Sequence, residues 1–237
     1  MPITELVFPL YKLDPQSLAG LKEKTPEIFQ SFSGVEGLQA AFRGPILEED
    51  GAAVDPKSMR SVLVLGRLSH ACLTTLLLTW GVIDWDTSSS FHDFFPKSNK
   101  FEAFVTTIKP FVADPATPEL YEAEDRSISC TSSNITQIIK ASSTEETENM
   151  WKQLEGAITE SPTDKPSFYH AKGIEKDEGT FLGLIGWQNL QVRRTSDMKH
   201  HNWYHNRNMN ELRKTKAFCS VLENWEKAEI FKTLWLR

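Results

Sequence analysis

The chain has 237 residues, of which 40% are hydrophobic and 24% are charged, so it can form one large globular domain or two small ones. Its formal net charge of −6 argues against a nucleic-acid partner, because neutralising phosphates requires a dense basic face. The chain start has no secretory signal pattern, and the most apolar run, residues 71–80, is too short to span a bilayer. We therefore expect a cytoplasmic protein without a membrane partner.

The first half of the chain predicts the order strand, helix, strand, strand, helix, strand. The pattern rests on alternating strand formers, on helix caps and on apolar residues at helical spacing. The segments are a strand in residues 3–11, a helix capped by Asp14, strands in residues 35–47 and 61–66, a helix capped at Ser88–Ser90 and interrupted by Pro96, with a helical face at Phe101, Phe104, Val105 and Ile108 after it, and a short edge strand at Glu119–Glu122.

The second half predicts the same order. Acidic residues at 145, 146 and 148 suit the first turn of a helix, whose dipole favours negative charge there. The segments are a strand at residues 134–141, a helix at 145–158, strands at 168–174 and Thr180–Trp187, a helix at 211–228 and a strand at 230–236.

This repeated order indicates a duplication. Residues 62–66 (VLVLG) match residues 182–186 (LGLIG), and residues 97–101 match residues 214–218. We predict an α+β fold of two tandem ferredoxin-like units, residues 1–125 and 126–237. A four-stranded sheet with helices on one face leaves its other face open, and the equivalent sheet of the other unit can cover it. We therefore expect an intramolecular dimeric α/β barrel, either monomeric or a weak homodimer.

A motif in the first half carries a resemblance to a known family. The run from Trp85 to Phe95 (WDTSSSFHDFF) resembles the W-x-S-x-x-x-x-H-x-x-F signature that follows the third strand of dimeric α/β-barrel proteins. These include antibiotic-biosynthesis-monooxygenase-like (ABM) and stress-responsive A/B barrel domains, with tandem forms among fungal proteins. The resemblance implies a ferredoxin-like fold with a ligand cavity between sheet and helices. Some members are cofactor-free oxygenases or polyketide cyclases, some bind or degrade haem, and many have no known activity.

Two segments depart from the family pattern. Residues 67–84 separate the expected third strand from Trp85, and residues 192–207 form a similar excess in the second half. Either both segments are surface insertions at equivalent loops, or both are translated introns. Spliced transcript that contains both segments would exclude the intron hypothesis.

Two histidines are the candidate catalytic residues. His92 follows the third strand and can act as a general base, because histidine titrates near neutral pH; the alternative is a capping or surface histidine. His170 neighbours Tyr169 in a strand, so one of the two side chains must point inward. A cavity-facing His170 could polarise a phenol or an enol, and the alternative is an exposed strand histidine.

Tyr11, Asn134 and Trp187 are the candidate ligand-binding residues, as polar or aromatic groups that can line a cavity. Core packing for Trp187 and a solvated strand end for Asn134 are the alternatives. His201 and His205 have a helical spacing that can bind metal, but they have no acidic or cysteine partner at a known spacing. Since Cys72, Cys130 and Cys219 form no metal pattern either, we expect no metal site.

The sequence leaves three functions open. The first is a barrel protein that handles a small hydrophobic or aromatic molecule as a cofactor-independent monooxygenase or polyketide cyclase in secondary metabolism. The second is a non-catalytic ligand-binding or stress-response protein on the same scaffold. The third is a haem-binding protein, which requires a histidine inside the cavity. An enclosed cavity with His92 or His170 in its wall favours catalysis, and a filled interface between the halves favours the structural alternative.

Overall fold

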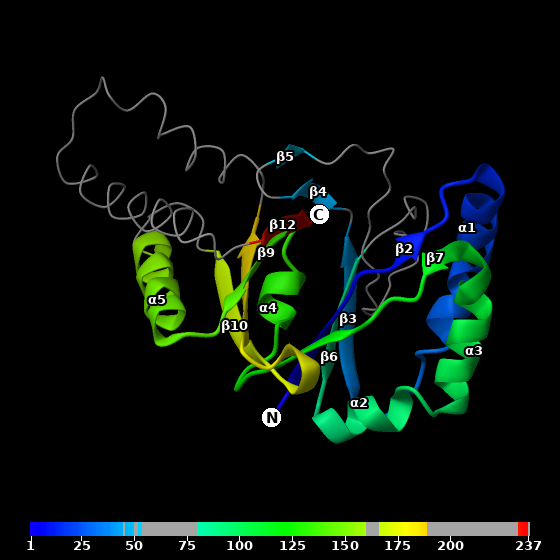
Figure 1. Cartoon of the computed structure of the whole chain (residues 1–237), viewed down its shortest axis with the longest axis horizontal. Helices are drawn as coiled ribbons and strands as arrows, with labels where there is room; N and C mark the ends of the chain where they lie inside the picture. The colour runs from blue at the N-terminus through cyan, green and yellow to red at the C-terminus, as the bar shows by residue number, and fades with distance from the viewer. Residues whose placement is uncertain (45, 50–51, 54–79, 160–165, 189–231, 237) are drawn as a thin grey trace.

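The computed structural model describes residues 1–44, 46–49, 52–53, 80–159, 166–188 and 232–236. Within these residues, ten strands form one sheet and two further strands form a separate pair. The first unit runs through β8 and the second unit begins at β9 (Figure 1). The predicted helix at residues 211–228 lies outside the described residues.

The described part of the first unit contains eight strands, of which β1, β3, β6 and β8 form the core of its sheet, and three α-helices. Its elements are β1 (Ile3–Val7), β2 (Leu10–Tyr11), α1 (Pro15–Gln30), β3 (Leu38–Gly44), β4 (Ile46–Glu49), β5 (Ala52–Ala53), β6 (Trp80–Trp85), α2 (Ser88–Phe94), α3 (Asn99–Ile108), the helical turn η2 (Lys109–Phe111), β7 (Val112–Asp114) and β8 (Glu119–Glu122). Asp14 caps α1 as predicted, since its Oδ1 accepts a hydrogen bond from the Ser17 backbone N–H at 2.8 Å. The cap of α2 is Thr87 rather than a serine of residues 88–90.

The second unit follows the short helix α4 (Ile128–Thr131), which connects the two units. Its elements are β9 (Ile135–Ser142), α5 (Glu145–Thr159), β10 (Ser167–Gly173), the helical turn η3 (Glu175–Asp177), β11 (Thr180–Trp187) and β12 (Lys232–Leu236). These bounds agree with the predicted strands and helix to within about two residues. The predicted division after residue 125 falls between β8 and α4.

The strand order of each unit is ferredoxin-like. The first unit has the order β3-β6-β1-β8 and the second has the order β10-β11-β9-β12, so each places its first strand between its third and fourth. All of these pairs are antiparallel. The predicted α+β fold of tandem ferredoxin-like units is therefore confirmed.

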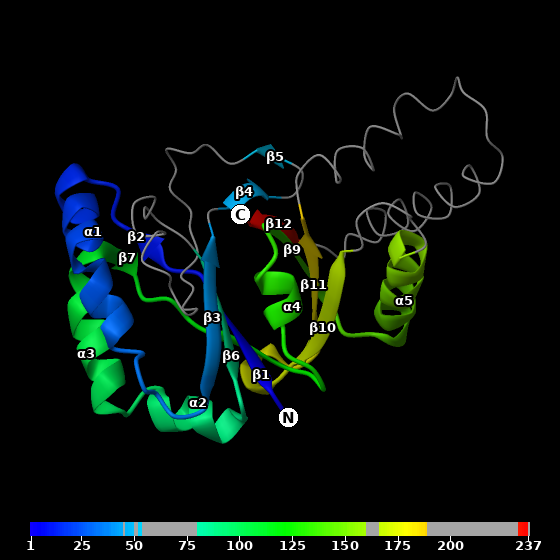
Figure 2. The same cartoon turned by 180° about the vertical axis from the view of Figure 1, so that it is seen from behind.

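The two units join into a barrel through their fourth strands. β8 pairs with β10, the second strand of the other unit, and β12 pairs with β4, which continues β3 after a single residue. The fourth strand of each unit thus pairs with a strand of the other unit, and the two sheets close into one barrel (Figures 1 and 2). β8 was predicted as an edge strand, but it has neighbours on both sides.

The register of the strands repeats from one unit to the other. Thr4 lies opposite Asp84 and Glu5 opposite Ile83, as Thr136 lies opposite Gly186 and Gln137 opposite Ile185. The repeat in letters is Ile3-Thr4-Glu5-Leu6-Val7 with Ile135-Thr136-Gln137-Ile138-Ile139, and Val82-Ile83-Asp84-Trp85 with Leu184-Ile185-Gly186-Trp187.

This register corrects the predicted third strand of the first unit. β6 (Trp80–Trp85) holds that place, and its first five residues belong to the segment 67–84 that the sequence pattern treated as additional. The counterpart of residues 182–186 is therefore found in β6 and not at residues 62–66. Residues 54–79, which include the remainder of that segment, and residues 192–207 lie outside the described residues.

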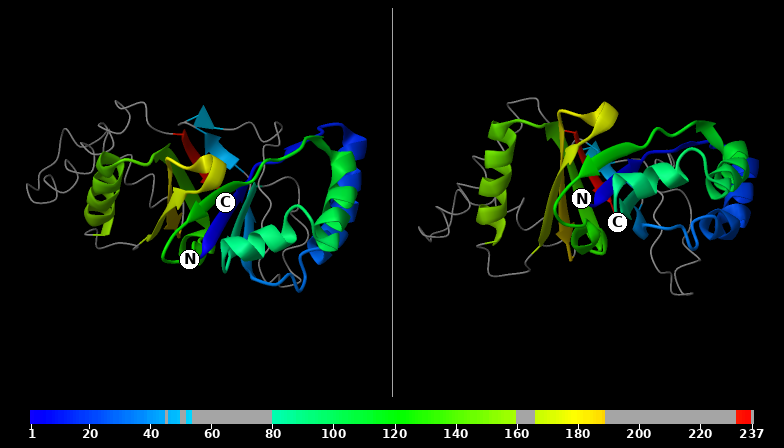
Figure 3. Two further views of the ribbon diagram at one scale, coloured as in Figure 1. Left: turned by 60° about the horizontal axis from the view of Figure 1, so that its bottom comes forward. Right: turned by 90° about the horizontal axis from the view of Figure 1, so that it is seen from below.

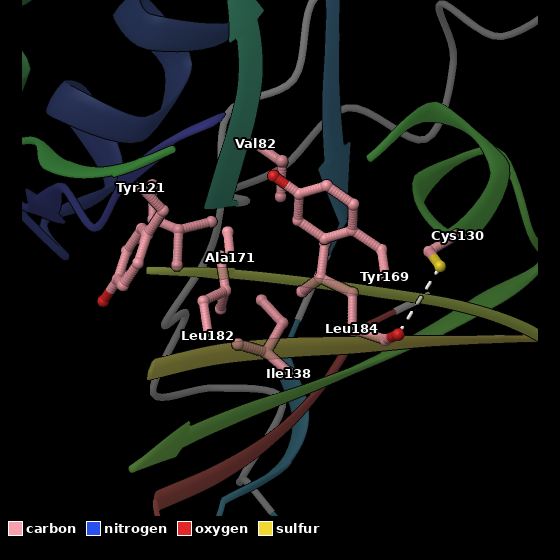
Figure 4. Packing of buried hydrophobic residues seen from close by; sticks show 9 residues of the cluster. Val82, Tyr121, Cys130, Ile138, Tyr169, Ala171, Leu182 and Leu184 are labelled. Atoms are coloured by element: carbon pink, nitrogen blue, oxygen red, sulfur yellow. Dashed lines mark hydrogen bonds between the residues drawn. The ribbon is translucent and has the colours of Figure 1, made fainter. Parts of the chain in front are cut away.

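Three of the four clusters of buried side chains in the described residues lie against the barrel strands, and the fourth lies between α1 and α3. Of the three, one lies inside the barrel, where both sheets meet (Figure 4); it includes Leu6, Val82, Tyr121, Cys130, Ile138, Tyr169, Ala171, Leu182 and Leu184. The other two layers lie on the outer faces of the sheets. The helices stand on opposite sides of the strands, α1 with α3 on one side and α5 on the other (Figure 3). No helix of the described part of the chain is long and apolar enough to cross a membrane.

Candidate functional site

A buried carboxyl group lies on the outer face of the first sheet. Glu5 is in the middle of β1, and its side chain is 6% exposed. Its partners in the neighbouring strands are Ile83 of β6 and Leu120 of β8, both buried and apolar. A carboxylate in such surroundings loses most of its hydration, so its charged form is costly in free energy. A buried group perturbed in this way is a candidate functional residue.

Trp85 supplies the hydrogen bond that Glu5 receives. Its indole Nε1–H donates to Glu5 Oε2 at 2.8 Å across two adjacent strands. Burial raises the pKa of Glu5 to about 7, and the Trp85 bond acts in the opposite direction by favouring the charged form. The carboxyl group can therefore gain or release a proton near neutral pH.

Aromatic side chains surround the Trp85 ring. Phe91 and Phe94 of α2 contact it at centroid distances of 5.9 Å and 5.6 Å. The buried members of this outer layer are Ile3, Phe32, Ala41, Ile83, Trp85, Phe91, Phe94 and Leu120. The α2 helix is placed so close to the strand because Thr87, two residues after Trp85, caps its first turn. The Glu5 carboxyl group therefore faces a packed layer of aromatic and aliphatic side chains.

The second unit has an equivalent tryptophan hydrogen bond, but its acceptor is an amide and not a carboxyl group. The Trp187 indole Nε1–H donates to Gln137 Oε1 at 3.4 Å, at the positions equivalent to Trp85 and Glu5. An amide does not titrate in water, so this pair can orient a group but cannot transfer a proton. The outer layer of the second unit is formed with α5 and includes Trp151, Leu154 and Phe181.

A second buried carboxyl group lies inside the barrel. Asp84 accepts hydrogen bonds from Thr4 Oγ1 at 2.8 Å and from Ser127 Oγ at 2.9 Å, and Thr4 Oγ1 lies 2.6 Å from the Tyr169 hydroxyl. Burial raises the pKa of Asp84, while its hydroxyl donors oppose this. Because Ser127 precedes α4, this network fastens the connecting segment to the end of the barrel.

The two candidate catalytic histidines lie outside the buried layers. His92 is on α2, about half exposed, and its Nε2 lies 2.6 Å from Glu175 Oε1 of the second unit. His170 is exposed on the outer face of β10, where its ring stacks on Phe181 at 6.0 Å. Tyr169 is the member of that pair that points into the barrel (Figure 4).

The three candidate ligand-binding residues lie apart from one another. Tyr11 is buried with Leu21, Ile28 and Ile108 beneath α1 and α3. Trp187 is buried in the outer layer of the second unit. The exposed Asn134 donates from Nδ2 to the Gln188 carbonyl at 2.7 Å. The structure does not gather the five predicted residues into one site, and their roles stay predictions.

Sequence reasoning missed Glu5 and Trp85 as a pair. The signal was present in the repeat, since an acidic residue sits in a strand whose counterpart has glutamine, each with a tryptophan at the end of the third strand. Assigning that strand to residues 61–66 hid the pairing, because β1 then had the wrong neighbour.

The described residues do not fit haem or a metal ion. Neither of the two histidines in this part of the chain, His92 and His170, lies in a buried layer where it could hold haem iron. The described residues also contain no group of three or more His, Cys, Asp or Glu side chains that could hold a metal ion.

Comparisons with known proteins give a fold but no close relative. No family model matches the sequence, and no curated protein is significantly similar to it. A putative monooxygenase from Fusobacterium nucleatum matches in structure with a TM-score of 0.54 at 11% identity, covering 100% of this chain and 91% of that one. A putative monooxygenase from Lactobacillus acidophilus matches at 0.49 with 10% identity, covering 100% and 93%. A mutant chlorite dismutase from Candidatus Nitrospira defluvii matches at 0.46 with 8% identity, covering 98% and 91%.

The fold follows from the strand order together with the first of these matches. The Fusobacterium protein matches the whole of this chain, so the likeness extends over both units. The pairing of each fourth strand with the other unit is the feature that converts two ferredoxin-like sheets into a barrel. The chain therefore has the dimeric α/β-barrel fold, with both halves of the barrel in one polypeptide.

Proposed function

We propose that the protein is an acid–base enzyme acting on a small aromatic or polyketide-like molecule, with Glu5 as its general base. The observation that carries this proposal is a carboxyl group with a pKa of about 7, buried in an apolar and aromatic layer and held by one indole N–H. General bases work best when their pKa lies near the working pH, and burial is the usual means of reaching it.

The reaction begins with the removal of a weakly acidic proton from the substrate. Ionised Glu5 takes a proton from a phenol hydroxyl or from a carbon between two carbonyl groups, and leaves a delocalised anion in the aromatic layer. That anion can transfer an electron to dioxygen, as in a cofactor-independent monooxygenase, or attack a carbonyl of the same molecule, as in a cyclase. The name of the Fusobacterium nucleatum protein, a putative monooxygenase of similar fold, is compatible with the first outcome.

The test uses Glu5→Gln, which gives the first unit the residue type that the second unit already has. With a panel of phenols and 1,3-diketones as substrates, we expect kcat/KM to fall by about 10²–10⁴-fold, the usual contribution of a general base. The matched control is Glu122→Gln, the same change at a partly exposed carboxylate on β8. Unchanged activity of Glu5→Gln would refute the proposal.

The pH dependence of kcat/KM and the consumption of dioxygen give two further readouts. Because Glu5 must be ionised to accept a proton, kcat/KM should rise with pH through about 7 and then level off. An oxygen electrode separates the two reactions, since a monooxygenase consumes dioxygen as product forms and a cyclase does not.

A non-catalytic ligand-binding or stress-response protein on the same scaffold is the second candidate. Nine buried side chains from both units fill the space between the two sheets, which is the arrangement expected of a structural barrel (Figure 4). This candidate predicts that panel compounds quench tryptophan fluorescence without turnover. Adding haem tests the remaining alternative, because a Soret band would favour it.

A further inference from the structure

A turn of the second unit lies against the Glu5–Trp85 site of the first. This turn, residues Ile174–Asp177, connects β10 to β11 and includes η3 (Figure 1, the yellow turn beside α2). The Ile174 backbone N–H donates to the Leu120 carbonyl at 3.0 Å, and the Leu120 N–H donates to Asp177 Oδ2 at 2.9 Å. Both backbone groups of Leu120 are thus bonded to the turn, and Leu120 is the strand neighbour of Glu5.

The other side of the turn reaches the Trp85 flank of the site. Glu175 Oε1 lies 2.6 Å from His92 Nε2, and His92 follows Phe91, whose ring contacts Trp85 edge to face. Ile174 packs against the outer layer that contains Trp85 and Leu120. One short turn therefore contacts both flanks of the Glu5–Trp85 pair.

The backbone of the turn shows that these contacts hold it in place. Glu175 has a φ of 55°, in the left-handed region that disfavours residues other than glycine. The side chain of Asp177 is 14% exposed, so its bond to Leu120 is largely shielded from water. Such a conformation persists where the surroundings fix it.

We propose that the turn Ile174–Asp177 is a cover that the second unit contributes to the site of the first, and that Asp177 and Glu175 are positioning residues that exclude water from Glu5. The catalytic site is then complete only across the two units. The consequence for catalysis rests on the proposed function of Glu5, whereas the exclusion of water can be measured without any substrate. His92 takes part as the anchor of Glu175 and not as a base.

Asp177→Ala tests the cover by removing the acceptor of the Leu120 N–H. We expect the pKa of Glu5, followed by ¹³C NMR of the labelled carboxyl and assigned with Glu5→Gln, to fall by about one unit as water enters. Exchange of the Trp85 indole N–H with solvent should accelerate at least about tenfold, because local opening becomes easier. Glu178→Ala, the same kind of truncation at an exposed residue one position further on, should change neither quantity.

Glu175→Gln provides a second test at an exposed position, where a substitution of nearly equal shape disturbs packing little. Exposed side-chain contacts are weak, so we expect indole exchange to accelerate by only about two- to fivefold, and His92→Gln should have the same effect. If Asp177→Ala does not fold, these two variants decide the matter. A Trp85 exchange rate and a Glu5 pKa that stay at their wild-type values in every folded variant would overturn the cover. Full activity of Glu5→Gln would instead overturn the proposed function and leave the cover intact.

Discussion

The two units of the barrel share the same strand order and register, but they differ in the residues at equivalent positions. In both, the first strand carries a hydrogen-bond acceptor on the outer face, and a tryptophan at the end of the third strand donates to it. The acceptor is the carboxyl group of Glu5 in the first unit and the amide of Gln137 in the second. The buried tryptophan N–H therefore has a hydrogen-bond acceptor in both units, and the second unit shows that this acceptor need not be an acid.

This difference separates a structural need from a functional one. Gln137 shows that a neutral amide satisfies the tryptophan and avoids burying a charge. Glu5 makes the same contact while its ionisation works against folding, as its raised pKa indicates. The difference between Glu5 and Gln137 is therefore the contrast on which the proposed role of Glu5 as a base rests.

The side of the sheet that faces the barrel interior also has a carboxyl group in the first unit and none at the equivalent position in the second. Asp84 of β6 fastens the segment before α4 through Ser127, whereas the equivalent residue of β11 is Gly186. A side chain at Gly186 would meet the Ser133 hydroxyl at 2.3 Å and the Cys130 backbone at 2.8 Å. The connecting segment lies so close to β11 that only glycine fits, and on β6 it uses a carboxylate instead.

Gly186→Asp should have the largest effect on stability, although it makes the second unit resemble the first. The new carboxylate would clash with the backbone of α4, and the nearest hydroxyls, those of Ser133 and Ser167, already donate to the Ser129 carbonyl. We expect a loss of about 4 kcal/mol or more, measured by urea denaturation. Gly156→Asp is the control, because a side chain there meets nothing within 4 Å. Equal stability of the two variants would show that α4 adapts freely and that the inner-face difference has no structural basis.

The pH dependence of stability should differ between the two acceptors. The pKa of Glu5 is raised from 4.5 in the unfolded chain to about 7 in the folded one. The folded state then binds the proton more tightly, so this contribution is fully present below pH 4.5 and is lost as pH rises through 7. The loss is on the order of 3 kcal/mol. Glu5→Gln should remove this slope, which denaturation curves between pH 4.5 and 8 measure. A slope that persists in Glu5→Gln would assign it to another group.

Local patterns predicted most of the fold. The alternation in β9, β10 and β11 and the Asp14 cap of α1 are signals that lie within a few residues of the elements they specify. The third strand of the first unit was misplaced because two apolar runs, residues 61–66 and β6, precede Trp85, and periodicity cannot choose between them. β8 was taken for an edge because its second neighbour, β10, belongs to the other unit.

The site was harder to predict than the fold for a physical reason. A single glutamate in a strand is usually exposed, and what buries Glu5 is contact with side chains far away in sequence, including Trp85 at a separation of 80 residues. His92 and His170 were chosen for their intrinsic pKa, but chemistry at neutral pH also arises when burial moves a carboxyl group into that range. Only the paired register of the strands reveals that environment.

Replacing each tryptophan by phenylalanine sharpens the comparison of the outer faces. Trp85→Phe removes the sole hydrogen bond described for the Glu5 carboxyl, so the pKa of Glu5 should rise further, and the loss in stability should be about 2 kcal/mol at pH 8. Trp187→Phe removes a longer bond to a neutral amide, and we expect about 1 kcal/mol with no dependence on pH. Denaturation of both variants at pH 5 and pH 8 measures the difference. Identical pH profiles would mean that the two acceptors are equivalent.

The smallest expected effect lies at the end of the barrel remote from α4, where Phe8 and Lys140 occupy equivalent positions one residue beyond the repeat. The Lys140 ammonium lies 4.1 Å from the Phe8 ring centroid and also pairs with Glu119 of the first unit, which accepts a hydrogen bond from the Tyr121 hydroxyl. About a quarter of each charged side chain is exposed, so we expect the coupling between Lys140 and Glu119 to be about 1 kcal/mol. A double-mutant cycle with Lys140→Met and Glu119→Gln measures it, and the double variant should lose less stability than the two single variants combined. Additive losses would show that the ion pair does not contribute to joining the two units, which the β8–β10 and β12–β4 pairings and the shared buried side chains would then join without it.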